Sequence, residues 1–486
     1  MSSVAKGRTL IGLCPLLAAV YFALPRQALP LRHAAAAHQS VIAGEEQHAP
    51  LPAADAIYNP DPNQIWNRLY RALYFRTAWD GKEYGPGELD PLLWGESTLS
   101  YASNDQAVKI LDEFLSTHSE RLIQGPLKRA ILQRDMWAIF DWLSDEPSGR
   151  SRVVTDLQVK LAQAIRQVAL TPAQLKALPD TYAAAASSKA FPVEYNPADP
   201  EAAFLPPDLF TPDGPWVSFA ETTEQGDLLA APAHARFFGA RSVFTAFLRL
   251  PAGRQATLAY LKQLRKFPKP LIPNPDERGY MLLSGPGRFE AAGTGSAFVP
   301  NPDLPQFPPG TEVALVRRII LVSDRGQPTP TALTESVQIR VFPNIPSRAD
   351  WLARRSGTIE NTFEFELDRP KLFAGVTGGL RALTKDDREF PEFLATPYDW
   401  LEMRPQSKSG AQSSAAFRHP VLAGCDRCHG APGIHSIVNT RAIWDGPGAQ
   451  SKFFDSSPSQ IAENTIERKR RQYNWGLLQG LWQSGL

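Results

Sequence analysis

The chain has three cysteines in 486 residues, and this scarcity limits what can hold its fold together. Cys14 lies near the N-terminus, whereas Cys425 and Cys428 lie three positions apart near the C-terminus. Such a pair cannot form a disulfide scaffold for a chain of this length. Hydrophobic residues make up 43% of the chain and charged residues 21%, as in globular proteins. We therefore expect folded hydrophobic cores, and a separate role for Cys425 and Cys428.

Residues 1–38 have the pattern of an export signal. Lys6 and Arg8 precede an apolar run over residues 9–24, and small residues follow at 34–37. A helix over this run would extend about 24 Å, which is less than the about 30 Å hydrocarbon core of a membrane. We expect a cleaved signal peptide and a location in the periplasm or cell envelope. An uncleaved N-terminal membrane anchor is the alternative, because no sharp cleavage site directly follows the apolar run.

The remaining chain divides into three regions, and together they predict an α+β multidomain fold. Residues 55–190 carry apolar side chains at spacings of three and four, which predicts a helical domain. Residues 191–370 combine proline-rich linkers with β-branched and aromatic runs, which predict a β-rich domain with antiparallel strands. Residues 371–486 are expected to form a mostly helical and loop-rich region. Its final helix is predicted to begin at Ser457 and Pro458.

Four runs in the middle region are typical of strands, because they are rich in β-branched and aromatic residues. Turn residues at 324–326 separate two of them. The final helix is expected to continue to about Trp482. The four predicted strands are residues 243–250, 313–322, 337–342 and 363–367.

The two C-terminal cysteines belong to the sequence Gly424-Cys425-Asp426-Arg427-Cys428-His429-Gly430. Its C-x-x-C-H spacing is the attachment pattern of a c-type haem. On one helical turn, Cys425 and Cys428 project to the same side, so their thiols can reach the two vinyl groups at one haem edge. His429 then presents its imidazole to the iron. We predict one covalently attached haem c, bound by Cys425, Cys428 and His429, with His429 as the iron ligand.

Two other roles for the cysteine pair have less support. A zinc site needs about four ligands, and no second cysteine pair supplies them, although His419 and His435 could join the site. A thioredoxin-like redox pair is expected to follow a βαβ pattern, and none precedes Cys425. The haem interpretation is therefore preferred.

Through Cys425, Cys428 and His429, the C-terminal segment resembles the c-type cytochromes. The resemblance implies an exported electron-transfer protein whose haem is attached outside the cytoplasm, with His429 as the proximal ligand. Residues 1–350 resemble no family that we can name. One departure affects the iron: such cytochromes usually place a methionine ligand well downstream of the motif, whereas all four methionines here lie upstream.

The sequence therefore leaves the sixth iron ligand open. Met403 and His419 lie just upstream of the motif, and His435 lies just downstream. His118 and His234 could reach the iron from other predicted regions. For each of these residues, core packing or a position at the surface is the ordinary alternative. An open sixth position that binds a small ligand is a further possibility.

A run of basic residues lies on the predicted final helix. It consists of Arg468, Lys469, Arg470 and Arg471, and we interpret it as a docking patch for an acidic redox partner. A solvated helix face is the alternative interpretation. The formal net charge of the whole chain is only +1, so no overall field attracts nucleic acid. Membrane association is expected only if residues 1–38 remain as an anchor.

The predicted function is electron transfer through the covalently attached haem, with a protein group as the sixth ligand. One alternative is a haem peroxidase-like or small-ligand-binding enzyme whose sixth iron position is open. Another is a non-catalytic binding or sensory module that contains haem. The sequence lacks a phosphate-binding loop, a dinucleotide fingerprint, a G-x-S-x-G motif and an H-E-x-x-H motif. Nucleotide-dependent and common hydrolase chemistries therefore have no support.

Overall fold

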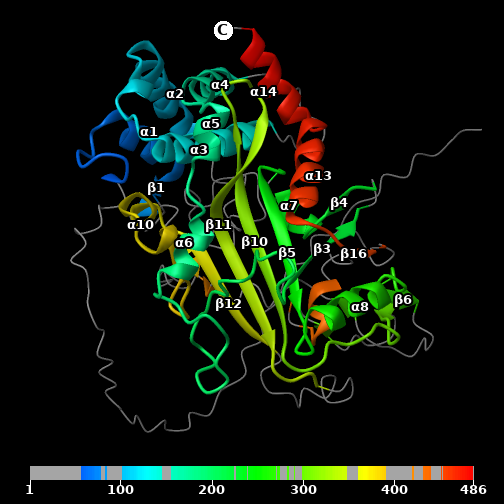
Figure 1. Cartoon of the computed structure of the whole chain (residues 1–486). Helices are drawn as coiled ribbons and strands as arrows, with labels where there is room; N and C mark the ends of the chain where they lie inside the picture. The colour runs from blue at the N-terminus through cyan, green and yellow to red at the C-terminus, as the bar shows by residue number, and fades with distance from the viewer. Residues whose placement is uncertain are drawn as a thin grey trace, which may run out of the picture. The chain divides into compact units, whose positions relative to one another are not determined.

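A computed structural model gives the arrangement of the chain from residue 56 onward (Figure 1). Contacts group residues 51–486 into one unit. The structure describes residues 56–77, 83–84, 101–144, 155–223, 226–237, 239–269, 271–273, 282–283, 289–290, 298–346, 360–389, 419–420, 429, 431–438, 450 and 452–484.

An antiparallel sheet of eight strands lies at the centre of the described residues (Figure 1). Its strand order is β13-β12-β11-β10-β5-β3-β16, and β4 also pairs with β3. The four predicted strands are confirmed as β5, β10, β11 and β12, and the predicted turn at 324–326 separates β10 from β11. The strands of this sheet are β3 (Val217–Thr222), β4 (Leu228–Leu229), β5 (Ser242–Arg249), β10 (Thr311–Val322), β11 (Pro328–Phe342), β12 (Asn361–Leu367), β13 (Leu380–Ala382) and β16 (Phe453–Asp455).

Both faces of the central strands are covered, which explains why β5 and β10 are buried almost throughout. Alternate residues of a strand point to opposite faces. One face of β10 and β11 is mostly apolar and packs against the segment that contains Phe204, Leu205 and Leu209. The residues on this face include Ala314, Val316, Val337, Ile339 and Val341.

The described residues of the region predicted to be helical form six α-helices, and α3 connects them to the sheet. The Gln133 side chain of α3 donates from Nε2 to the Val322 carbonyl at 2.9 Å, and its Oε1 accepts from the Val322 amide at 2.9 Å. The amide side chain thereby satisfies both backbone groups at the end of β10. The six helices are α1 (Ile65–Tyr74), α2 (Tyr101–Ser116), α3 (Pro126–Ser144), α4 (Asp156–Gln167), α5 (Pro172–Lys176) and α6 (Thr181–Ser187).

Shorter elements complete the described part of the chain. The strand β16 comes from the region predicted to form the C-terminal domain, yet it pairs with β3. Segments from the middle and C-terminal regions thus share one sheet, while the predicted domain boundaries stay predictions. The other elements are β1 (Arg76–Thr77), β2 (Glu83–Tyr84), η4 (Ser119–Arg121), α7 (Pro232–Phe237), α8 (Arg254–Leu264), β6 (Leu271–Pro273), β7 (Leu282–Leu283), β8 (Phe289–Glu290), β9 (Phe298–Pro300), α10 (Arg369–Ala374), η5 (Thr377–Gly379), β14 (Arg388–Glu389) and β15 (His419–Pro420).

The chain ends in two helices rather than the single predicted one, because the helix stops at Arg471 and restarts after Gln472. The first, α13 (Pro458–Arg470), begins as predicted. The Ser457 Oγ accepts from the Gln460 amide at 3.2 Å, and the Gln460 Oε1 accepts from the Ser457 amide at 3.2 Å. This reciprocal cap satisfies two backbone donors. The second helix is α14 (Tyr473–Gln483).

The cap on α13 gives a first testable prediction. Replacing Ser457 by Ala should lower the free energy of unfolding by about 1 kcal/mol, because the Gln460 amide loses its acceptor. Urea unfolding monitored by circular dichroism measures this change. The control is Ser116→Ala, whose hydroxyl bonds only to carbonyls of its own helix. Equal effects of the two variants would contradict the importance of the cap.

The basic run on α13 differs from the predicted docking patch. Lys469 is fully buried, and its Nζ contacts the Asp141 carboxylate and donates to the Gly239 carbonyl at 3.0 Å. Two of the arginines form ion pairs with Asp227. Lys469 therefore cannot belong to the predicted docking patch, because burial and an internal carboxylate hold it inside the fold. Docking of an acidic partner at Arg468, Arg470 and Arg471 stays a prediction.

The apolar run at residues 9–24 lies outside the described residues. Among the helices that the structure describes, none has the length and apolar character needed to cross a membrane.

Candidate functional site

One face of the sheet forms the floor of a cavity. Phe219, Ala246, Leu315 and Gln338 lie opposite one another across β3, β5, β10 and β11, as the strand register requires. Directly paired residues of antiparallel strands point to the same face. Arg340 lies two positions beyond Gln338 on β11 and extends the same row of side chains. All five residues line the cavity, so its floor follows directly from the strand pairing.

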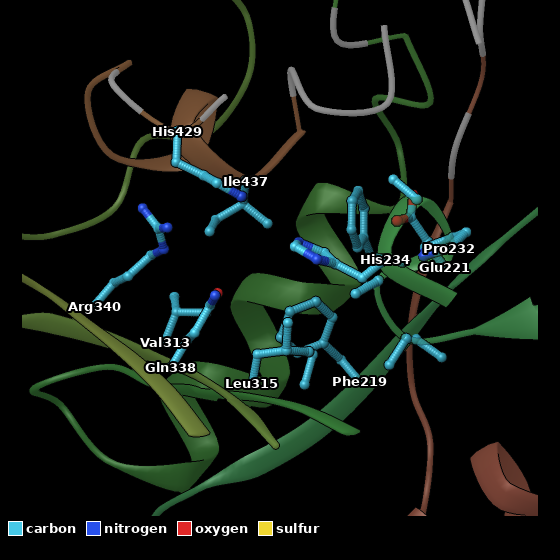
Figure 2. A pocket seen from close by; sticks show the side chains of 16 residues that line it. Phe219, Glu221, Pro232, His234, Val313, Leu315, Gln338, Arg340, His429 and Ile437 are labelled. Atoms are coloured by element: carbon cyan, nitrogen blue, oxygen red, sulfur yellow. The ribbon is translucent and has the colours of Figure 1, made fainter. Parts of the chain in front are cut away.

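Two short segments form the walls (Figure 2). The helix α7 and the residues before it supply one wall, which includes His234. His429 and Ile437, from the segment around 431–438, supply the other. The cavity has a volume of about 70 Å³, or about 690 Å³ when the space that opens to solvent is included. It is therefore a mostly apolar cavity, whose polar lining includes two imidazoles, the Arg340 guanidinium, the Gln338 amide and the Glu221 carboxyl group.

Hydrogen bonds from Gln306 hold the segment that follows His429. The Gln306 Oε1 accepts from the Ile434 amide at 2.8 Å. Its side chain also packs so closely against Gly433 that a side chain there would overlap it. Gly433 has a φ of +56°, a conformation that glycine adopts without strain. The buried side chains of Ile434 and Val438 anchor the same segment in the core.

A chain of polar contacts orients the His429 ring. Its Nδ1 lies 2.7 Å from the Ser436 carbonyl oxygen, which is a hydrogen-bond acceptor. The ring therefore donates from Nδ1, and its Nε2 carries the lone pair. The Ser436 hydroxyl donates to the Glu360 carboxylate at 2.9 Å. Glu360 also forms a buried ion pair with Arg340, so the wall that contains His429 is connected to the floor.

Both cavity histidines are held in the neutral form. Burial, together with the positive charges of Arg340 and Arg317, lowers the pKa of His234 to about 4. Burial and the Arg340 charge also lower the pKa of His429 well below its usual range, although its hydrogen bond to Ser436 acts in the opposite direction. A neutral imidazole is the form that binds a metal. The electrostatics of the cavity therefore favour the ligand-competent form of both rings.

The two imidazoles face each other across the cavity. The ring centroids of His234 and His429 are 6.0 Å apart, and the ring planes differ by only 12°. Figure 2 shows both rings projecting from their opposite walls into the same space. Within the described part of the chain, no group forms a hydrogen bond with the His234 ring.

The residues of the cavity fit the haem that the C-x-x-C-H motif implies. Two neutral imidazoles are suitable axial donors for haem iron. The Arg340 Nη2 is buried and has no hydrogen-bond partner among the described residues, so it could receive a carboxylate such as a haem propionate. The apolar floor suits a porphyrin. The enclosed part of the cavity is smaller than a porphyrin, so a haem would also occupy the part that opens to solvent.

Of the three predicted haem-binding residues, only His429 lies within the described residues. Cys425 and Cys428 lie outside them, so their prediction stays untested. In the described part of the chain, no group of three or more histidine, cysteine or acidic side chains could hold a metal ion. The site thus consists of the two facing histidines and their surroundings.

The five candidate sixth ligands lie in different parts of the chain, and among those whose side chains the structure describes only one lines the cavity. His234 faces His429, whereas His118 has a side chain 57% exposed that pairs with Glu120. His435 does not belong to the cavity lining. His419 lies in β15, and its side chain is not described. Met403 lies outside the described residues.

Arg340 and Gln338 were not predicted as site residues. Their only signal is that they are polar residues at alternate positions of a predicted strand, which usually indicates a solvated face. No protein-family model, curated protein or solved structure matches this chain. Its function must therefore be inferred from the site residues themselves.

Proposed function

We propose that the protein is an exported monohaem c-type cytochrome-like protein that transfers electrons through one covalently attached haem. The observation that carries the proposal is the C-x-x-C-H motif, whose histidine lines an apolar cavity and is oriented by the Ser436 carbonyl. A hydrogen bond from the ring nitrogen that does not bind the metal to a backbone carbonyl is typical of metal-binding histidines. Residues 1–38, with their export-signal pattern, agree with haem attachment outside the cytoplasm.

Each site residue has a specific part in this function. Cys425 and Cys428 would attach the haem edge, and His429 would bind the iron through Nε2. Arg340 provides a buried positive charge and an available donor, which suit a propionate group. When bound, haem supplies one-electron redox chemistry. The apolar residues of the floor around Leu315 would keep water away from a bound haem, which would help to set its reduction potential.

Covalent haem attachment gives the second testable prediction. The full-length protein is produced in a host that matures exported c-type haem, and the denatured protein is examined by pyridine haemochrome spectroscopy. We expect one covalent haem per chain. The Cys425→Ala/Cys428→Ala double variant should lose it completely, because no thiol remains in the motif.

The matched control is Cys14→Ala, which should retain the covalent haem, because Cys14 lies within the predicted signal. Wild-type protein without covalent haem would overturn the proposed function. The cysteine pair would then have to serve in thiol or metal chemistry instead.

A further inference from the structure

We infer that His234 is the sixth ligand of the iron, on the opposite side from His429. The inference rests on the proposed function, because it assumes that a haem is attached next to His429. It adds the chemical identity of the second axial group, which the sequence leaves open. It also decides between electron transfer and chemistry at an open iron position.

The spacing of the two rings matches that of two imidazoles on one metal atom. A coordinating imidazole nitrogen lies about 2.0–2.1 Å from its metal, so two imidazoles on opposite sides of one metal have ring centres about 6 Å apart. The His234 and His429 centroids are 6.0 Å apart. Directly stacked rings would approach to about 3.5–4.0 Å between their atoms. Figure 2 shows both rings directed into the space between the two walls, where one metal atom could lie.

The hydrogen bonding of the two rings also supports a metal atom between them. The His429 Nδ1 is engaged by the Ser436 carbonyl at 2.7 Å, which leaves Nε2 for the cavity. No described group forms a hydrogen bond with the His234 ring, although it lines an apolar cavity. A polar group in such surroundings is costly without a partner. A metal bond would provide that partner.

The fold holds His234 in place without help from a ligand. It lies on α7, and its ring contacts Phe244 of β5 at a centroid distance of 5.8 Å. Ala230 and Ala235 on either side of His234 are buried, so the short helix is anchored against the sheet. A ligand held in this way is already oriented before the metal binds.

Two imidazole ligands have a distinct consequence for function. Strong ligands on both sides make the iron low-spin and leave no position for peroxide or another small molecule. Electrons can then pass without bonds to the iron being made or broken. The 12° angle between the rings further predicts the rhombic electron paramagnetic resonance signal of nearly parallel axial imidazoles.

The third testable prediction concerns the spin state of the ferric protein. The wild-type haem protein should be low-spin, and near-infrared magnetic circular dichroism should identify two imidazole ligands. In His234→Ala, the covalent haem content should be unchanged while the low-spin signal is lost. Added imidazole should restore that signal, because it can enter the space left by the side chain. His234→Leu provides a second variant, which keeps much of the side-chain volume but has no atom that binds iron, and it should lose the low-spin signal as well.

Two control variants show whether the spectral change is specific to His234. His435→Ala and His118→Ala should keep the wild-type spectrum, since neither residue lines the cavity. A low-spin wild-type spectrum that survives in His234→Ala would overturn the inference, as would a high-spin wild-type protein or evidence of a thioether ligand. With covalent haem in the wild type, a surviving low-spin spectrum or a thioether ligand would leave the proposed function intact, whereas a high-spin iron would favour chemistry at an open iron position. Absence of covalent haem would overturn the proposed function itself.

Discussion

Replacing Glu360 by Gln is expected to lower the free energy of unfolding by about 3 kcal/mol, because a buried cation loses its counter-charge. The Arg340 side chain is only 4% exposed and the Glu360 side chain 6%. An amide at position 360 can still form hydrogen bonds, but it cannot neutralise the guanidinium. The Ser436 hydroxyl would also lose its charged acceptor. The change should therefore also loosen the segment that orients His429.

Urea unfolding measures the effect on stability, and the ferric spectrum of the proposed haem would measure the effect on the site. The matched control is Glu113→Gln, which removes an ion pair to Arg68 whose partners are 45% and 39% exposed. That change should cost less than about 1 kcal/mol, because water screens exposed pairs. If both variants lost the same stability, the Arg340–Glu360 pair would not be the link between floor and wall that its burial indicates.

Replacing Glu335 by Gln is expected to destabilise the fold by about 3–5 kcal/mol at neutral pH. Glu335 is buried and forms ion pairs with Arg134 of α3 and Arg317 of β10, and it accepts from the Ser242 hydroxyl at 2.7 Å. Burial alone would raise the pKa of this carboxyl group. The two guanidinium groups and the serine outweigh burial and lower the pKa to about 2. The ionised form is therefore the one that the fold stabilises.

The same carboxylate predicts a pH dependence. Because its pKa is lower in the folded than in the unfolded chain, Glu335 contributes its full stability above its ordinary pKa of 4.5. That contribution is lost progressively as the pH falls from 4.5 toward about 2. The stability difference between wild type and Glu335→Gln should thus be largest at neutral pH and should shrink on acidification. Urea midpoints measured across this range test it, and a difference that does not change with pH would contradict the assignment.

Local patterns were sufficient to predict many of the elements. The β-branched and aromatic runs predicted β5, β10, β11 and β12, and the Ser457-Pro458 pair predicted the start of α13. Each of these signals is contained within a few neighbouring residues. The break between α13 and α14 was missed, because the apolar positions continue past Gln472 to Trp482.

The two polar residues of the cavity floor could not be predicted from the sequence. In β11, Gln338 and Arg340 alternate with Val337, Ile339 and Val341, a pattern that normally indicates one solvated face. Here that face is buried, since Arg340 is paired inside the protein. Its partner Glu360 lies in another segment, so no local pattern could reveal the pair. The burial of Lys469 was missed for the same reason, because Asp141 is far away in the sequence.

The pairing of β16 with β3 determines how a C-terminal fragment of the protein would behave. A fragment that begins at residue 371 would carry the cysteine pair and His429, but it would lack α7, β5, β10 and β11. Its own strand β16 would have no neighbour, because β3 lies more than two hundred residues earlier. The C-terminal segment is therefore not an excisable module. The cavity wall that faces His429 exists only after the distant strands have assembled, so the proposed haem site would be complete only in the whole folded chain.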